Sequence, residues 1–308
     1  MASQTDKLLA DASAVVADDQ AKPADRLVAC EVLVQHGVVE PALPVLRTLV
    51  SHPELVGGAR LLLHTAEYMK RRGLVNELTS PPGETETGKK AAIGDAAFWR
   101  NRDPERAAKD LLLIFTGQEK NFWISLDLLH RIIRNLAGQA VYLRDFADVF
   151  FLAGIDPYRS YQATLKSLER IVKQSAARKL YTLGISAGGF AALKYGLDLS
   201  ADGVLAFSPP TDVHSWLKDA ETAARFKEFS IADEALDLVP FYDQAKRRPD
   251  VTIVYGGANE FDERQASRLA HLPGVRLQPI PNLAMHGSVA HLLATGRFEG
   301  LVRELLTR

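Results

Sequence analysis

The apolar positions of the first 75 residues follow a helical period. From about Asp6 to Val75, apolar side chains recur every three or four residues, with breaks at Pro23, Pro41 and Pro53. This spacing gives each helix one apolar face, and the short connections favour antiparallel neighbours. The pattern predicts an all-α N-terminal domain over residues 1–78.

The pattern changes after residue 110, where short apolar runs alternate with amphipathic stretches of helical period. The runs predict strands in six segments: 111–117, 140–143, 179–185, 203–208, 251–256 and 275–280. Strands that are apolar almost throughout and separated by helices are typical of a parallel sheet covered on both faces. We therefore expect an α/β domain over residues 96–308.

Two further segments interrupt these regular patterns. Residues 79–95, TSPPGETETGKKAAIGD, are rich in Pro, Gly and Thr and predict a linker. Residues 209–250 follow the fourth predicted strand and predict a helical, lid-like insertion. The insertion carries five aromatic side chains that either wall a pocket or pack the insertion onto the sheet: Trp216, Phe226, Phe229, Phe241 and Tyr242.

Composition narrows the class of protein. The chain has 308 residues, of which 47% are hydrophobic and 24% are charged, and its formal net charge is −1. It lacks the basic excess of proteins that bind nucleic acid. No apolar stretch reaches the roughly 18–20 residues that span a bilayer. The N-terminus lacks the basic segment and unbroken apolar run of a signal peptide. We therefore expect a cytoplasmic protein.

Cys30 is the one cysteine of the chain. A single cysteine excludes an internal disulfide and a zinc site built on several cysteines. Its position in the apolar helical stretch RLVACEVLV predicts a buried side chain rather than a reactive thiol.

One short stretch, LYTLGISAGGFAALKYG, carries the clearest chemical signal. Its first residues predict a strand and its last residues a helix, with Ser186 at the junction in a Gly–x–Ser–x–Gly pattern. A serine on such a turn is held out from the sheet, and small neighbours let strand and helix approach. We interpret Ser186 as a nucleophile, although a purely structural Gly/Ser turn has the same composition.

A serine nucleophile needs a base and an orienting carboxylate. Of the eight histidines, His286 lies a few residues after the last predicted strand, where a loop can reach the same edge of a parallel sheet as Ser186. Asp262 follows the strand that ends near Gly256 and is the predicted acid, and Glu260 is the alternative. The chain order serine, acid, histidine is Ser186, Asp262, His286.

An oxyanion hole requires two N–H donors. The residue after the nucleophile, Ala187, supplies one backbone N–H at the start of the predicted helix. In the α/β-hydrolase fold, which the Ser186 motif resembles, the other donor comes from the loop after the first core strand, here FTGQEKNFW, just after the glycine. The resemblance therefore implies Gln118 as the first candidate and Glu119 as the second.

These motifs resemble the α/β-hydrolase fold from Leu111 to Arg308. The resemblance rests on GISAGG with its flanking strand and helix, on the acid loop 257–262 and on Met285–His286–Gly287. GISAGGFAAL with the later LAFSPPTD is also similar to bacterial hydrolase-like proteins of surface-glycan pathways. The early antiparallel strands of the fold are not evident before Leu111, so we expect a shortened sheet. The segment 38–73 resembles a tetratricopeptide-type helical hairpin.

The resemblance implies a serine hydrolase that cleaves an ester, of the carboxylesterase or deacylase type, through an acyl-enzyme. It implies no metal and no organic cofactor. An acyltransferase with the same triad, acting on a glycan or another alcohol, is one alternative, since the first half-reaction is shared. A non-catalytic scaffold is the other, because fold does not determine function. In that case the helical N-terminal domain would bind a protein partner.

Overall fold

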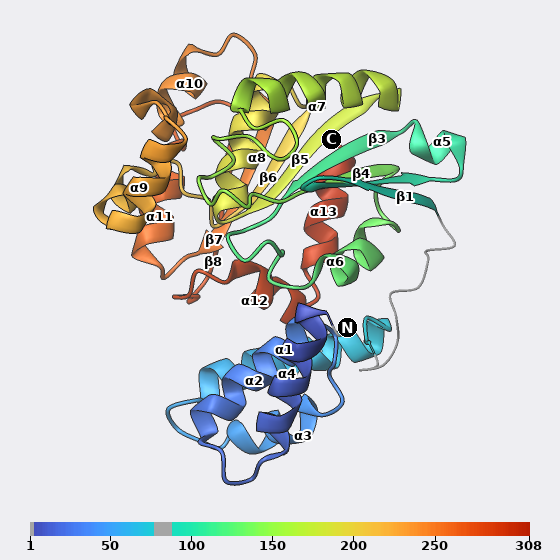
Figure 1. The fold of residues 1–308 in the computed structure, drawn as a ribbon, viewed down its shortest axis with the longest axis vertical. Coiled ribbons are helices and arrows are strands. Elements are labelled where there is room, and N and C mark those ends of the chain that lie inside the picture. The colour runs from blue at the N-terminus through green and yellow to red at the C-terminus, as the bar shows by residue number, and fades with distance from the viewer. Residues whose placement is uncertain (1–2, 77–87) are drawn as a thin grey trace. The chain divides into compact units, whose positions relative to one another are not determined.

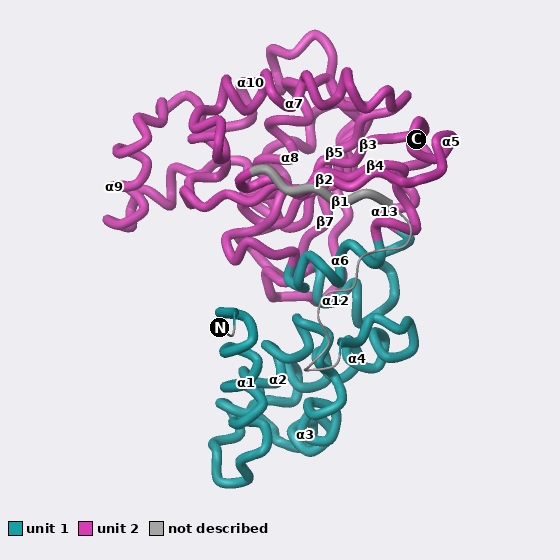
Figure 2. Tube along the Cα trace, turned by 45° about the vertical axis from the view of Figure 1, so that its right-hand side comes forward, with its two compact units in different colours: residues 1–84, 123–132, 289–300 teal, residues 85–122, 133–288, 301–308 magenta. Residues whose placement is uncertain are grey.

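The computed structural model describes residues 3–76 and 88–308. The chain divides into two compact units (Figures 1 and 2). The first unit consists of residues 1–84, 123–132 and 289–300. The second consists of residues 85–122, 133–288 and 301–308.

The first unit begins with the helices expected from the apolar period. They are α1 (Gln4–Ala17), α2 (Pro23–Gln35), α3 (Ala42–Leu49) and α4 (Val56–Arg72). Cys30 is fully buried among them, and this burial raises the pKa of its thiol to about 11. The prediction of a buried, unreactive thiol is confirmed as far as burial is concerned.

Two segments from later in the chain complete the first unit, beyond the 1–78 boundary expected from sequence. Arg131 donates a hydrogen bond to the carbonyl of Val75 at 3.0 Å, and the Tyr68 hydroxyl donates to Glu299 at 2.8 Å. A periodic apolar face identifies a helix, but it does not identify the distant segment that packs against that helix.

The second unit is built on a sheet that has eight strands within the described residues. Their order is β1-β2-β4-β3-β5-β6-β7-β8, and neighbours from β4 to β8 are parallel. The strands are β1 (Gly88–Ile93), β2 (Ala96–Asn101), β3 (Asp110–Phe115), β4 (Gln139–Leu143), β5 (Lys179–Ile185), β6 (Gly203–Phe207), β7 (Asp250–Gly256) and β8 (Val275–Ile280). The predicted α/β fold with a mostly parallel sheet is confirmed.

The expectation of a shortened sheet is wrong. β1 and β2 form an antiparallel hairpin joined by Gly94 and Asp95, and β2 also pairs antiparallel with β4. Gly94 has a φ of 53°, which glycine adopts without strain in a tight hairpin turn. β1 thus occupies residues that the sequence assigned to the 79–95 linker, whose residues 79–87 lie outside the described part. Lys, Ala and Gly are weak strand formers, so only pairing with β2 identifies this strand.

Helices cover both faces of the sheet. α7 (Tyr161–Ser175) and α8 (Ala187–Asp198) cover one face (Figure 1). On the other face, the Tyr181 hydroxyl of β5 donates to the carbonyl of Arg308 at 3.1 Å, beside the end of α13. The remaining α-helices outside the insertion are α5 (Pro104–Ala107), α6 (Leu126–Ile133), α11 (Glu260–Ser267), α12 (Ser288–Ala294) and α13 (Phe298–Leu306).

The segment between β6 and β7 forms the predicted helical insertion. It contains η1 (His214–Lys218), α9 (Ala220–Glu228), η2 (Asp233–Leu236) and α10 (Val239–Gln244). Its aromatic side chains mostly pack inward: Trp216 lies edge-on to Phe150 with ring centroids 5.5 Å apart, and Phe226 is buried beside the same ring. Phe229 remains exposed. Packing onto the core therefore accounts for most of these rings.

In the two described stretches, no helix combines the length and the apolar character needed to cross a membrane.

Candidate active site

Ser186 lies between β5 and α8, on the turn that the sequence predicted. Its backbone has φ 51° and ψ −120°, a conformation that non-glycine residues adopt rarely and at a cost in energy. A Cβ at Gly184 would lie 2.0 Å from the carbonyl oxygen of Gly188, and one at Gly188 would lie 2.2 Å from that of Phe115. The two glycines therefore permit the close strand–helix contact that holds the serine in this conformation.

His286 reaches Ser186 from the loop after β8. Its Nε2 lies 2.9 Å from the Ser186 Oγ, within hydrogen-bond distance. The loop is anchored to the end of β7, because the N–H of Ala258 donates to the carbonyl of Leu283 at 3.0 Å. About 46% of the His286 side chain is exposed, so the imidazole is accessible from solvent.

Asp262 occupies the other side of the imidazole. Its Oδ1 lies 2.8 Å from the His286 Nδ1, and its side chain is almost fully buried in α11. Because the carboxylate can only accept, Nδ1 carries the proton and Nε2 is left to accept one from the serine. Glu260, the alternative acid, is exposed at the first position of α11.

The second oxygen of Asp262 is buried without a hydrogen-bond partner among the described residues. His286 is thus the principal group that compensates the charge of Asp262, and the carboxylate is well placed to stabilise an imidazolium.

Gln118 and Ala187, the two predicted oxyanion-hole residues, line one small, enclosed cavity that has no room for a water molecule. Ala187 is the first residue of α8, where backbone N–H groups have no partner within the helix. In the turn after β3, the N–H groups of Gly117 and Lys120 are used in hydrogen bonds to Asn121 and Gly117. Glu119, the second candidate, is not among the residues that line this cavity.

Sequence reasoning missed two buried serines near the site. Ser208, just after β6, donates to the Oγ of Ser288 at 3.0 Å, and the N–H of Ser288 donates to the carbonyl of His286 at 2.9 Å. Ser208 is the last residue of the predicted strand 203–208, but its partner Ser288 lies 80 residues further along the chain. No local pattern could have indicated this pairing.

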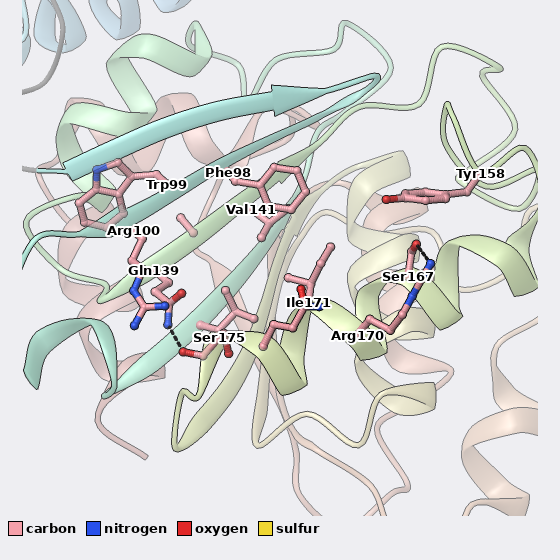
Figure 3. Close-up of a pocket in the computed structure, with 13 residues that line it drawn as sticks. Phe98, Trp99, Arg100, Gln139, Val141, Tyr158, Ser167, Arg170, Ile171 and Ser175 are labelled. Atoms are coloured by element: carbon pink, nitrogen blue, oxygen red, sulfur yellow. Dashed lines mark hydrogen bonds between the residues drawn. The ribbon is translucent and has the colours of Figure 1, made fainter. Parts of the chain in front are cut away.

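A larger cavity, of about 460 Å³, lies elsewhere in the second unit, between β2, β4 and α7 (Figure 3). Phe98 and Val141 contribute apolar surface, and Arg100 and Arg170 contribute cations. Among the described residues, its lining contains no histidine and no carboxylate that could activate its two serines. The larger volume of this cavity is therefore not matched by catalytic chemistry, which the structure places at the edge that carries Ser186.

Comparison with known proteins gives matches in structure but not in sequence. No family model and no curated protein sequence matches the chain. The capsule O-acetyltransferase of Neisseria meningitidis serogroup A, in a mutant form in complex with CoA, matches with a TM-score of 0.51 and 12% identity. The match covers 70% of this chain and 94% of that chain.

Two other solved structures match with similar coverage. MenH from S. aureus has a TM-score of 0.48 and 12% identity, over 69% of this chain and 98% of that chain. An esterase from Pyrococcus furiosus, Pf2001, has a TM-score of 0.46 and 15% identity, over 72% of this chain and 92% of that chain. The resemblance of the N-terminal helices to tetratricopeptide hairpins finds no support in these comparisons.

Proposed function

The chain has the α/β-hydrolase fold, and we propose that it is a serine hydrolase that cleaves an acyl ester through a covalent acyl-enzyme. The observation that carries this proposal is the continuous hydrogen-bonded chain from Ser186 through His286 to Asp262. The three residues lie in the turn after β5, in α11 after β7 and in the loop after β8, and hydrogen bonds of 2.8 and 2.9 Å link them. This arrangement is the one that activates a serine hydroxyl at neutral pH.

The geometry supports the following sequence of steps. The Ser186 oxygen attacks the ester carbonyl carbon while its proton passes to the His286 Nε2. The carbonyl oxygen becomes an oxyanion beside the backbone N–H groups of Gln118 and Ala187. His286 then gives the proton to the departing alcohol, which leaves an acyl group on Ser186. Water, deprotonated by His286, cleaves this acyl-enzyme and regenerates the serine.

Asp262 supports each of these steps without itself exchanging a proton. Its carboxylate accepts from the Nδ1–H, fixes the tautomer and stabilises the imidazolium. The small-molecule or glycan-linked ester that we propose as substrate needs no metal or organic cofactor for this chemistry.

A fluorophosphonate probe tests the proposal directly. We expect wild-type protein to gain the mass of one phosphonyl group at Ser186 and Ser186→Ala to gain none. A panel of aryl and alkyl esters then defines the acyl group. Failure of the wild type to be labelled, while a control hydrolase reacts fully, would contradict an activated serine and favour the non-catalytic scaffold.

Acyl transfer is the second candidate, because the O-acetyltransferase of Neisseria meningitidis shares this fold. The same acyl-enzyme would be resolved by a sugar or another alcohol in place of water. Product analysis at increasing concentrations of an alcohol acceptor distinguishes the two. A transferase gives acylated acceptor in excess of free acid at low acceptor concentration, whereas a hydrolase gives free acid throughout.

A further inference from the structure

The turn that carries Gln118 is held by the side chain of Lys120. The Lys120 Nζ donates to the carbonyl oxygen of Gln118 at 2.6 Å. The backbone of the same turn is closed by two hydrogen bonds of 3.0 Å, from Lys120 to Gly117 and from Gly117 to Asn121. Lys120 therefore fixes the orientation of the peptide unit next to the proposed oxyanion donor.

Lys120 also forms an ion pair with Asp148. Asp148 lines the same small cavity as Gln118 and Ala187. A carboxylate at this position opposes the formation of an oxyanion, because two negative charges in a partly buried site repel each other strongly. The cation beside Asp148 offsets this repulsion.

A second cation reaches Asp148 from the insertion. The Arg225 side chain of α9 lies 3.7 Å from the other carboxylate oxygen of Asp148. Asp145, the other acid that lines the cavity, accepts hydrogen bonds from the backbone N–H groups of Ala147, Val149 and Phe151. Burial nevertheless raises the pKa of Asp145, and these N–H groups offset only part of that effect. Asp148, in contrast, faces two cations, Lys120 and Arg225.

We propose that Lys120 is a positioning residue that makes the oxyanion hole functional by holding the Gln118 turn and neutralising Asp148. Arg225 adds to this neutralisation when α9 is packed in place, which links the insertion to the reaction. The inference rests on the proposed serine hydrolase function. It assigns Asp148 the role of a charge that must be compensated, and not the role of a catalytic acid.

A double-mutant cycle on Lys120 and Asp148 tests the proposal in the full chain. Lys120→Met should lower kcat by about 10- to 100-fold and change KM little. This fall in kcat is no greater than the fall expected when one oxyanion-hole donor is removed. Asp148→Asn should cost at most about 3-fold, since Asn tolerates the positive φ of this residue. The double variant should recover most of the activity lost in Lys120→Met, because it no longer contains the uncompensated carboxylate.

Further variants separate this role from simple loss of structure. Lys120→Arg keeps the charge and should retain most of the activity, and Arg225→Gln should cost about 2- to 5-fold, because its pair with Asp148 is longer and partly exposed. Lys179→Met is the matched control. Lys179 pairs with Asp202 at 3.0 Å at the opposite end of β5, and its loss should leave kcat unchanged.

Two outcomes would overturn the inference, and they are distinguishable. If wild type turns over an ester but the double variant is as slow as Lys120→Met, the neutralisation of Asp148 is wrong while the hydrolase proposal stands. If wild type turns over no ester and takes no phosphonate adduct, the proposed function fails, and this inference fails with it.

Discussion

Among the histidines of the second unit that pair with aspartates, His286 and His214 differ in what faces the second ring nitrogen. His286 has the buried Asp262 at Nδ1 and the Ser186 hydroxyl at Nε2. His214, in the insertion, has Asp212 at Nδ1 at 2.6 Å and Asp233 at Nε2 at 3.3 Å. A hydroxyl can give its proton to the imidazole, whereas two carboxylates can only accept from it.

This difference separates the proposed base, His286, from an ion-pair partner, His214. The hydrogen bond with Asp212 raises the pKa of His214 above its usual value, and Asp233 acts in the same direction. His214 is therefore held toward the imidazolium form and has no free nitrogen to receive a proton. A His–Asp pair indicates a catalytic base only when a nucleophile occupies the other side of the ring.

The largest expected effect comes from His286. His286→Ala should reduce the kcat for ester hydrolysis by about 10⁵-fold, because a serine without its base is a poor nucleophile. His214→Ala is the matched control and should leave kcat nearly unchanged. Steady-state kinetics on the best ester measures both, and equal losses in the two variants would contradict the assignment of the base.

Asp262 and Glu260 should differ by several orders of magnitude. Asp262→Asn should lower kcat by about 10⁴-fold, since an amide stabilises the wrong tautomer of His286. Glu260→Gln should change it by less than about twofold, as is usual for an exposed residue without a specific role. The same kinetic assay measures both variants, and the reverse ranking would identify Glu260 as the acid.

Gly188→Ala should destabilise the second unit and distort the Ser186 turn. The added Cβ would lie 2.2 Å from the carbonyl oxygen of Phe115, so strand and helix must separate. We expect a loss of about 1–3 kcal/mol in the free energy of unfolding. Gly300→Ala in α13 is the control, because no atom lies within 4 Å of its added Cβ. Urea unfolding followed by circular dichroism should show no loss in that variant.

The smallest effect concerns pH and His214. Because its pKa is raised on folding, its contribution to stability is fully present below the unfolded value of 6.5 and is lost as pH rises through the folded pKa. The side chain is 41% exposed, so solvent screens the effect. Asp212→Asn should lower the His214 pKa in an NMR titration and weaken the fall in stability above pH 6.5. An unchanged titration would contradict the role of Asp212.

The sequence predicted the parts of the site that depend on local structure. Ser186 follows from a strand, a tight turn and a helix within 17 residues, and the expected strands that precede the acid and histidine loops are all present. The catalytic roles of these residues stay a prediction. The choice between Asp262 and Glu260 depends on where α11 begins, and periodicity alone does not fix a helix start to one residue.

The features that sequence reasoning missed depend on distant contacts. β1 consists mostly of weak strand formers and is defined by its pairing with β2, which in turn pairs with β4. Lys120 and Asp148 lie 28 positions apart along the chain, and Arg225 follows Asp148 by a further 77 positions, so no spacing rule connects them. Such partnerships are set by the tertiary fold, which brings a turn, a loop and an inserted helix to one cavity.

The first unit combines helices from the start of the chain with segments from much later, and this affects when the unit can be completed during translation. Its helices α1 to α4 are synthesised early, yet Tyr68 of α4 has its partner in Glu299, 231 positions later. Arg72 pairs with the same carboxylate. Translation must therefore pass residue 299 before these contacts can form. The helices α1 to α4 are thus synthesised well before the segment that completes their unit, and nearly the whole second unit is made in between.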